Sequence, residues 1–453
     1  MKKEKMSVSK LLGYGLGEVG SQLIWYMVSS YLMLFYTDIL TLSAGAIAMI
    51  MLVARIWDAV NDPMMGAIAD RTRTKWGRFR PYIIFGTPVL ALFNLLTFTV
   101  FPVHGVVKVA LALICYIGAG MAYTAVSTAY ASLVNVIAKK SQEKQDLSAA
   151  RTVGSSVAQL VLAIAAMPLI LKLGHSEVAT GQGYFRTVLL FSLVAIPCLW
   201  LTAFLCKETY GNELHQNHEK KSLKESLINI FRNKQIVLAM LVCFMVTTAI
   251  MGRITLLSYY VIYVMGSYTL VGAVMGVMCI GAIVFSMLIP IFTRIMGKRN
   301  WLICICSIMS IGMIGTYFAD PTNVPVILVL SFMIGVGNSG QGVIFGMFSD
   351  CIDYSDYKYV VREEGLSFSF ITFAVKLAGA LVGAVGVVLL AKFGYVAGVE
   401  QTEAAKAGIN MVVNIIPAIC TIIGLIPLFF YKLSNKKMAE IAQELEKRKI
   451  EKE

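Results

Sequence analysis

Long apolar stretches alternate with short polar segments along almost the whole chain. Each stretch contains about twenty residues or more, which is the length that an α-helix needs to cross the hydrocarbon core of a bilayer. The pattern predicts an all-α membrane protein with about twelve transmembrane helices. Their expected limits are 11–36, 43–69, 81–102, 107–137, 152–173, 187–206, 236–265, 270–292, 301–318, 324–348, 365–391 and 407–431.

One long polar stretch interrupts this pattern near the middle of the chain. It divides the protein into an N-terminal six-helix bundle, a cytoplasmic middle loop, a C-terminal six-helix bundle and a cytoplasmic tail. The expected boundaries are 1–206, 207–234, 235–432 and 433–453. Two six-helix halves joined by a polar linker indicate the major-facilitator type of transporter, whose site lies between the halves near the bilayer midplane.

Basic residues are concentrated in alternate loops, including the turn from Arg71 to Arg80 and the tail that starts at Lys432. Because cytoplasmic loops carry an excess of Lys and Arg, both termini are expected on the cytoplasmic side. This topology accounts for the net charge of +13 without a nucleic-acid partner. The apolar run that follows Lys10 is too long for a signal-peptide core. We therefore expect a multi-pass protein of the plasma membrane, here the cytoplasmic membrane of a bacterium.

The composition agrees with a membrane protein and offers no enzyme signature. The chain is 58% hydrophobic and 14% charged, whereas a soluble domain has about 25% charged residues. The nine cysteines lie mostly in apolar runs, and without a Cys-x-x-Cys pair they are interpreted as small hydrophobic residues. The sequence also lacks a nucleotide loop, a nucleophile elbow and zinc spacing. We expect no enzyme activity and no cofactor besides a coupling ion.

Three charged residues fall on one face of the second predicted helix, namely Arg55, Asp58 and Asp62, and the Asn61 amide could assist the two acids. Residues three and four apart are neighbours on a helix surface. A carboxylate near the middle of a bilayer costs about 2.5–3.5 kcal/mol on insertion scales, so both acids should face the protein interior. Oxygen ligands suit a hard cation, and two adjacent acids would equally suit a proton. The alternative is a salt bridge to Arg55 that only holds helices together.

Polar and aromatic residues also occur together in the first predicted helix. Glu18 and Gln22 are four residues apart, and Trp25 and Tyr26 follow. Sugar hydroxyls need paired donors and acceptors, and sugar C–H faces pack on aromatic rings. The combination is therefore typical of a sugar site. The alternative is a polar contact between helices, with Tyr26 facing lipid.

Two cationic side chains lie deep inside later predicted helices, Arg253 and Lys376. Such groups are costly in a membrane unless they are paired or face a wet cavity. Arg253 is interpreted as a forked contact to an anionic or polyhydroxyl substrate, or else as a structural partner of an acid such as Glu18. Lys376 is expected to face the cavity and to pair with Asp58 or Asp62.

Other candidates are less specific. Thr124 and Gln341 offer hydrogen-bonding groups inside helices, but close packing of small residues explains such positions equally well. Arg151 lies near a membrane face, where a gating role and a structural role are both open. Asp350 and Asp353 belong to a charged cytoplasmic turn that also contains Arg362 and Glu363. This turn is interpreted as a gate of ion pairs between the two halves.

Several segments resemble the glycoside–pentoside–hexuronide:cation symporters, a family that includes the melibiose and glucuronide carriers. The most specific segment runs from Arg55-Ile-Trp-Asp58 through Asn61-Asp62-Pro63 to Gly66, and then from Asp70-Arg71-Thr72 to Arg80-Pro81. Support continues in 14–18, 35–38, 350–357 and Lys376. The resemblance covers essentially the whole chain.

This resemblance implies roles for residues at matching positions. Asp58, Asp62 and Thr124 match the family's cation site, which would admit Na⁺. Lys376 matches a lysine near that site, and Arg151 matches a residue used at the cytoplasmic side.

The sugar site departs from the melibiose pattern. Gln22 and Ser127 stand where that pattern has acids, and Ala131 and Gln341 stand where it has tryptophans. Melibiose is therefore disfavoured as the substrate. The departure suits a uronide, and it suits a neutral pentoside or glycoside equally well. The candidate substrate-binding residues are Glu18, Gln22, Trp25, Tyr26, Ser127, Arg253, Gln341 and Lys376.

The sequence thus predicts a secondary active symporter that imports a sugar, glycoside or uronide with Na⁺ or H⁺ by alternating access. The expected partners are the small-molecule substrate and the lipid bilayer, and the protein is expected to work as a monomer. Two alternatives stay open. One is a non-transporting membrane sensor or scaffold of the same fold, and the other is a transporter of non-sugar cargo.

Overall fold

The computed structural model describes residues 7–138, 141–208, 232–359, 364–397 and 399–450. Apart from one isolated β-bridge between Thr74 and Gly77, the regular structure in these ranges is helical. The predicted middle loop falls largely on 209–231, outside the described residues, as does the end of the predicted tail at 451–453.

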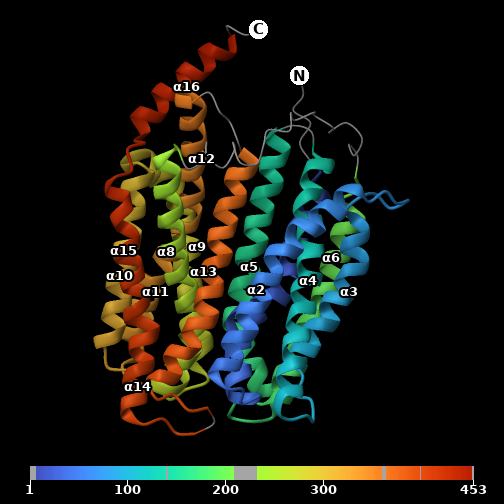
Figure 1. Ribbon diagram of the computed structural model, residues 1–453, viewed down its shortest axis with the longest axis vertical. Coiled ribbons are helices and arrows are strands. Elements are labelled where there is room, and N and C mark those ends of the chain that lie inside the picture. Colours follow the sequence, from blue (N-terminus) through green and yellow to red (C-terminus); the bar gives the residue numbers. More distant parts are fainter. Residues whose placement is uncertain (1–6, 139–140, 209–231, 360–363, 398, 451–453) are drawn as a thin grey trace. The chain divides into compact units, whose positions relative to one another are not determined.

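The helices before the middle loop begin with α1 (Val8–Leu34) and the short π-helix η1 (Phe35–Ile39). These are followed by α2 (Ala44–Arg71), α3 (Arg80–Thr97), α4 (Gly105–Ile137), α5 (Ser141–Gly174) and α6 (Gly181–Leu205). After the middle loop come α8 (Lys234–Tyr259), the π-helix η2 (Tyr260–Val264), α9 (Leu270–Met296), α10 (Lys298–Phe318), α11 (Val324–Asn338), α12 (Gly340–Tyr359), α13 (Glu364–Lys392), α14 (Glu403–Asn410), the π-helix η3 (Met411–Ile415), α15 (Ile416–Phe429) and α16 (Asn435–Ile450). Figure 1 shows these elements in sequence colours.

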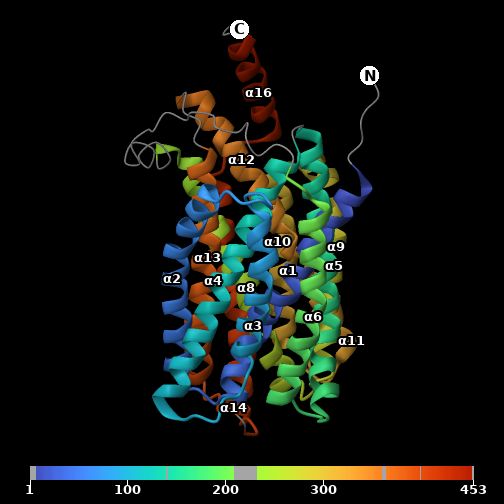
Figure 2. The ribbon, with the colours of Figure 1, turned by 90° about the vertical axis from the view of Figure 1, so that its right-hand side faces the viewer.

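Ten helical segments in the described part of the chain are long and apolar enough to cross a membrane. The other two predicted spans coincide with α1 and α3, which have 27 and 18 residues. The predicted all-α membrane architecture is therefore confirmed. The predicted tail contains one further helix, α16, which extends beyond α12 in Figure 2.

One predicted boundary is wrong. The sequence placed Asp350 and Asp353 in a turn, but both lie on α12, which continues to Tyr359. Apolar and small residues continue to recur at helical spacing there, and Cys351 and Ile352 are buried. A buried apolar face therefore continues after the sequence has become polar, and the helix continues with that face.

The described chain forms two compact units. The first contains α1 to α6 together with two later segments, 261–276 and 383–401. The second contains 232–260, 277–359, 364–382 and 402–450. The domain boundaries expected from the sequence stay a prediction.

Small residues let α1 approach its neighbours in the first unit. A Cβ added to Gly15 would lie 3.1 Å from the carbonyl oxygen of Ala150 on α5. Close backbone approach of this kind is how helices associate where lipid removes the hydrophobic driving force. It brings the polar face of α1 next to α5.

A carboxylate closes the start of α3. Glu208, which follows α6, accepts hydrogen bonds from the backbone N–H groups of Arg78 (2.8 Å), Phe79 (2.7 Å) and Arg80 (3.1 Å). The first N–H groups of a helix have no partner within the helix, and they favour a negative charge. Gly77 directly precedes these three N–H groups and has φ +109, a backbone conformation that would be strained with a side chain. An added Cβ would also meet the Glu208 carboxylate.

Candidate functional site

The two acids of α2 face α4. The Thr124 hydroxyl donates a hydrogen bond to Asp62 Oδ1 at 3.0 Å. A Cβ added to Gly120 would lie 3.3 Å from Asp58 Oδ1. Asp58 and Asp62 are one helical turn apart, as are Gly120 and Thr124, so the two helices run alongside each other at this level. Both acids are half-buried.

The other polar residues of this face are also near. Arg55 forms an ion pair with Asp58, with Nη1 and Oδ2 3.2 Å apart. Asn61 is completely buried, and neither atom of its side-chain amide has a hydrogen-bond partner within the described part of the chain. A buried amide left in this condition is costly unless a ligand or water satisfies it. Together with the Thr124 hydroxyl of α4, this face offers carboxylate, hydroxyl and amide oxygens, which suit a small hard cation.

The polar residues of α1 meet α5. Glu18 is 5% exposed. Its carboxylate accepts one hydrogen bond from Gln22 (2.8 Å) and another from Arg151 Nε (2.8 Å). The Arg151 guanidinium also lies 5.5 Å from the centre of the Tyr130 ring, within range of a cation–π interaction. Gln22 and Arg151 therefore hold Glu18 in a fixed, charge-compensated position.

Aromatic residues from α1 and α4 stack beside these polar groups. The rings of Trp25 and Tyr123 are 4.1 Å apart and nearly parallel. Tyr26 is 7% exposed, so the alternative that it faces lipid is wrong. The Ser127 hydroxyl donates to the carbonyl oxygen of Thr124, at 3.4 Å. One helix, α4, thus carries Thr124 beside the α2 acids and also Tyr123, which stacks on Trp25 of α1.

Arg253 is fully buried in the second unit. Its Nη1 donates to Asn414 Oδ1 on η3, and the Asn414 amide donates to Asn410 (2.7 Å). The guanidinium lies 5.6 Å from the centre of the Tyr260 ring. Its Nε and Nη2 have no hydrogen-bond partner within the described residues. The observed partner is therefore an amide, whereas one of the two interpretations of the sequence paired Arg253 with an acid.

The remaining candidates are spread over the second unit. Gln341 on α12 accepts a hydrogen bond from Thr247 on α8 (3.3 Å). Asp350 binds Lys298 at 2.7 Å, within its own unit. Lys376 lies near the middle of α13 and is half-buried, as is Asp353 on α12. The expected pairing of Lys376 with Asp58 or Asp62 stays a prediction, as does a gate between the halves. Two charged residues assigned to that gate, Arg362 and Glu363, lie outside the described residues.

Sequence reasoning missed a polar cluster in the first unit, formed by Thr37, Asp38, Tyr263 and Tyr395, which we call the Asp38 cluster. Asp38 accepts hydrogen bonds from the hydroxyls of Thr37 (2.7 Å), Tyr263 (2.5 Å) and Tyr395. Burial raises the pKa of the Asp38 carboxyl, while the three hydrogen bonds oppose that shift. The segment Phe35–Asp38 contributed to the family resemblance, but nothing in it indicated the two tyrosines.

The fold is similar to that of solved structures. A solved structure of the nucleoside transporter NupG superimposes with a TM-score of 0.64 at 13% identity, covering 94% of this chain and 100% of that one. At this identity the likeness concerns the fold alone.

The family follows from sequence. Residues 13–435 match the family model described as MFS/sugar transport protein, and the chain belongs to that family. The uncharacterized symporter YnaJ of Bacillus subtilis (strain 168) is 31% identical over 98% of this chain and 96% of its own length. The glucuronide carrier protein homolog of Escherichia coli (strain K12) is 27% identical over 98% and 97%. The chain is thus a multi-pass sugar symporter of a bacterial cytoplasmic membrane, and these relatives are transporters rather than enzymes.

Proposed function

We propose that this symporter imports a sugar, glycoside or uronide together with Na⁺ or H⁺ by alternating access. The observation that carries the proposal is the meeting of α2 and α4, where two carboxylates share one helix face and Thr124 donates to one of them. The coupling ion binds among Asp58, Asp62, Asn61 and Thr124. Arg55, which is paired with Asp58 at 3.2 Å, compensates the acids when no ion is bound.

The sugar binds beside this cation site, at Glu18, Gln22, Trp25, Tyr26 and Ser127. Its hydroxyls bond the carboxylate and amide, and one sugar face packs on the aromatic pair. The two sites share α4, because Thr124 and Ser127 are three residues apart and hydrogen-bonded. An ion that fixes α4 against α2 therefore favours sugar binding, and the sugar favours ion binding by the same factor.

The choice between an acidic and a neutral sugar depends on the cations of the second unit. Lys376 and Gln341 are retained as substrate contacts, and a carboxylate on the sugar would suit Lys376. The burial of Arg253 against Asn414 favours a structural role for this residue over direct substrate contact. The relative named as a glucuronide carrier homolog supports testing uronides first. Arg151, Asp350 and Asp353 act in gating, and a single chain in the bilayer is sufficient.

The test is uptake by right-side-out membrane vesicles against a panel of labelled glycosides and uronides, with Na⁺ and pH gradients imposed separately. One gradient should drive accumulation by the wild type. Asp58→Asn and Asp62→Asn should lose that accumulation, since coupling of the usual size is worth about 5- to 150-fold in affinity. Asp320→Asn removes an exposed acid and serves as the matched control.

Two results would overturn the proposal. Full gradient-driven accumulation by both variants would remove the α2 acids from coupling. The absence of uptake for every sugar, with correctly inserted protein, would favour the non-transporting sensor or a non-sugar cargo instead.

A further inference from the structure

A cavity of about 530 Å³ lies in the second unit where α9 and α15 end and where α10 and α16 begin. Five cationic side chains line it, and none of the described lining residues is acidic. The five are Arg294, Lys298, Arg299, Lys432 and Lys436. So many like charges around one hollow repel each other, and an anion would relieve that repulsion.

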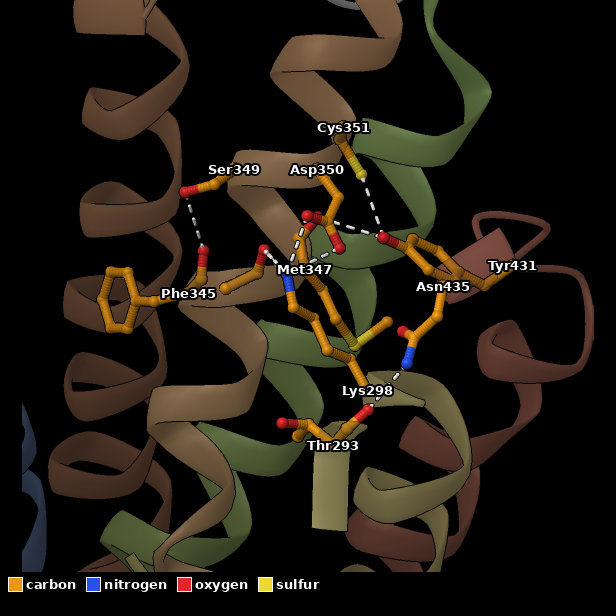
Figure 3. A network of polar contacts seen from close by, with 10 residues as sticks. Thr293, Lys298, Phe345, Met347, Ser349, Asp350, Cys351, Tyr431 and Asn435 are labelled. Atoms are coloured by element: carbon orange, nitrogen blue, oxygen red, sulfur yellow. Dashed lines mark hydrogen bonds and ion pairs between the residues drawn. The ribbon is translucent and has the colours of Figure 1, made fainter. Parts of the chain in front are cut away.

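One of the five cations already has an acidic partner. Lys298 Nζ lies 2.7 Å from Asp350 Oδ1 and 3.2 Å from the carbonyl oxygen of Gly346. Figure 3 shows the lysine turned toward α12 and its acid. The positive charge of the other four is therefore what a ligand of this cavity would meet.

Arg299 has unused hydrogen-bonding capacity. Its Nη2 reaches the carbonyl oxygen of Phe429 only at 3.4 Å. Its Nε is buried without a hydrogen-bond partner in the described part of the chain. A guanidinium offers a fork of donors that matches a phosphate or carboxylate, so an anion in the cavity would satisfy this group.

The start of α16 adds a second source of positive potential. Asn435 donates its side-chain amide to the carbonyl oxygens of Thr293 (2.8 Å) and Arg294 (3.4 Å), which holds the helix start against the end of α9. Figure 3 shows this amide directed at Thr293. The first backbone N–H groups of a helix attract negative charge, and Ser434, Asn435 and Lys436 line the cavity.

Apolar side chains border the same cavity. Ile295 is 73% exposed and Phe429 is 64% exposed, and both are among the lining residues. They lie at or near the ends of helices long and apolar enough to span a membrane, which is where lipid headgroups are expected to begin. A free inorganic anion would use only the cations, whereas a phospholipid would use the cations and the apolar rim together.

We propose that this cavity binds the headgroup of an anionic phospholipid. Its phosphate lies among Arg299, Lys432, Lys436 and the start of α16, and its acyl chains lie against Ile295 and Phe429. Basic pockets between membrane helices are known to hold anionic headgroups by this combination of charge and apolar contact. The bound lipid joins the ends of α9, α10, α15 and α16 within the second unit. This site is independent of the α2 acids and of the transported sugar.

The test uses full-length protein in lipid nanodiscs of neutral phosphatidylcholine, to which phosphatidylglycerol, phosphatidylcholine or inorganic phosphate is added. Bound lipid is counted by native mass spectrometry, and the thermal unfolding midpoint is recorded in parallel. Phosphatidylglycerol should be retained preferentially and should raise the midpoint. Lys432→Gln/Lys436→Gln changes two exposed side chains and should weaken retention by about fivefold for each lysine.

The matched control is Lys172→Gln/Lys392→Gln, which removes two exposed lysines elsewhere and should leave retention unchanged. Equal retention of phosphatidylglycerol and phosphatidylcholine by the wild type would overturn the proposal. Stabilisation by inorganic phosphate equal to that by phosphatidylglycerol would reduce the site to an anion site without lipid. An equal loss in both double variants would assign the effect to general surface charge. If the double variant unfolds in neutral lipid, Lys436→Gln alone supplies the same comparison.

Discussion

Glu18 in the first unit and Arg253 in the second are both ionisable, both buried inside helices, and partnered very differently. Glu18 has a cation and an amide within 2.8 Å, so its charge is compensated. Arg253 has one amide oxygen, from Asn414, and two nitrogens without a partner in the described residues. Removing one partner of a buried charge costs more than removing the charge itself. We therefore expect mutation of Glu18 to affect transport, and mutation of the partner of Arg253 to affect the stability of the fold.

The environments explain this contrast. Arg151, which compensates Glu18, is 45% exposed along its side chain and can exchange its partner at low cost. Asn414 lies in the π-helix η3 and is fully buried. The first site is thus suited to rearrangement, and the second is suited to holding α8 against η3.

The largest expected effect is on transport at Glu18. Glu18→Gln should reduce uptake at least tenfold, because loss of one partner of a buried charge pair costs about 2–5 kcal/mol. Arg151→Lys should keep part of the activity, since the positive charge remains. Initial uptake rates in vesicles measure both. Glu400→Gln, at an exposed position, is the control, and normal uptake by Glu18→Gln would end the comparison.

The next effect is on stability at Arg253. Asn414→Leu should lower the free energy of unfolding by about 3 kcal/mol, because it leaves a buried guanidinium without its one amide partner. Arg253→Met should cost less, since it removes the unsatisfied donors together with the charge. Thermal unfolding in one detergent ranks the variants. A larger loss for Arg253→Met than for Asn414→Leu would contradict the assigned roles.

A third case lies between these two, because the Asp38 cluster compensates an acid with hydroxyls alone. Burial raises the pKa of Asp38, so the folded state binds this proton more tightly than the unfolded state. The resulting stability is present below the ordinary pKa of the carboxyl and is lost as pH rises through the raised pKa.

Asp38→Asn cannot ionise at this position, so its unfolding midpoint should fall less than that of the wild type as the pH is raised from acidic to neutral. Unfolding midpoints of both proteins, measured across this pH range in one detergent, test the sign of the difference. Identical pH profiles for the two proteins would mean that Asp38 does not titrate differently on folding.

The smallest expected effect tests whether the α2 acids need space as well as charge. Gly120→Ala would place a methyl group 3.3 Å from Asp58 Oδ1. We expect a coupling-ion dependence of uptake that is weaker by about two- to fivefold, since such a contact requires only a small shift. Gly45→Ala, on α2, has nothing within 4 Å of the added methyl group and should have no effect.

Part of this site could be predicted from the sequence because its signal is local. Arg55, Asp58 and Asp62 interrupt an apolar helix at helical spacing, and only an interior position makes that tolerable. Thr124 was indicated only by the family resemblance, since a lone hydroxyl in a small-residue helix has a simpler explanation. The hydrogen bond to Asp62 adds the geometric reason.

The rest could not be predicted because its partners are remote or ordinary. The tyrosines that bind Asp38 are 225 and 357 residues away along the chain, and a tyrosine near a helix end carries no specific signal. For Arg253 the sequence left open a substrate contact or a pairing with an acid, and the hydrogen-bond partner is a neutral asparagine 161 residues away. The extent of α12 was missed because buried small residues continue its apolar face after the composition turns polar.

The carboxylate cap at the start of α3 also has a practical side for anyone who cuts or tags this protein. Glu208 is the last residue described before 209–231, yet its side chain completes a helix more than a hundred residues earlier. A first fragment that ends beyond Glu208 keeps this acceptor for the start of α3. A fragment that stops at Cys206 would instead leave the N–H groups of α3 without their acceptor.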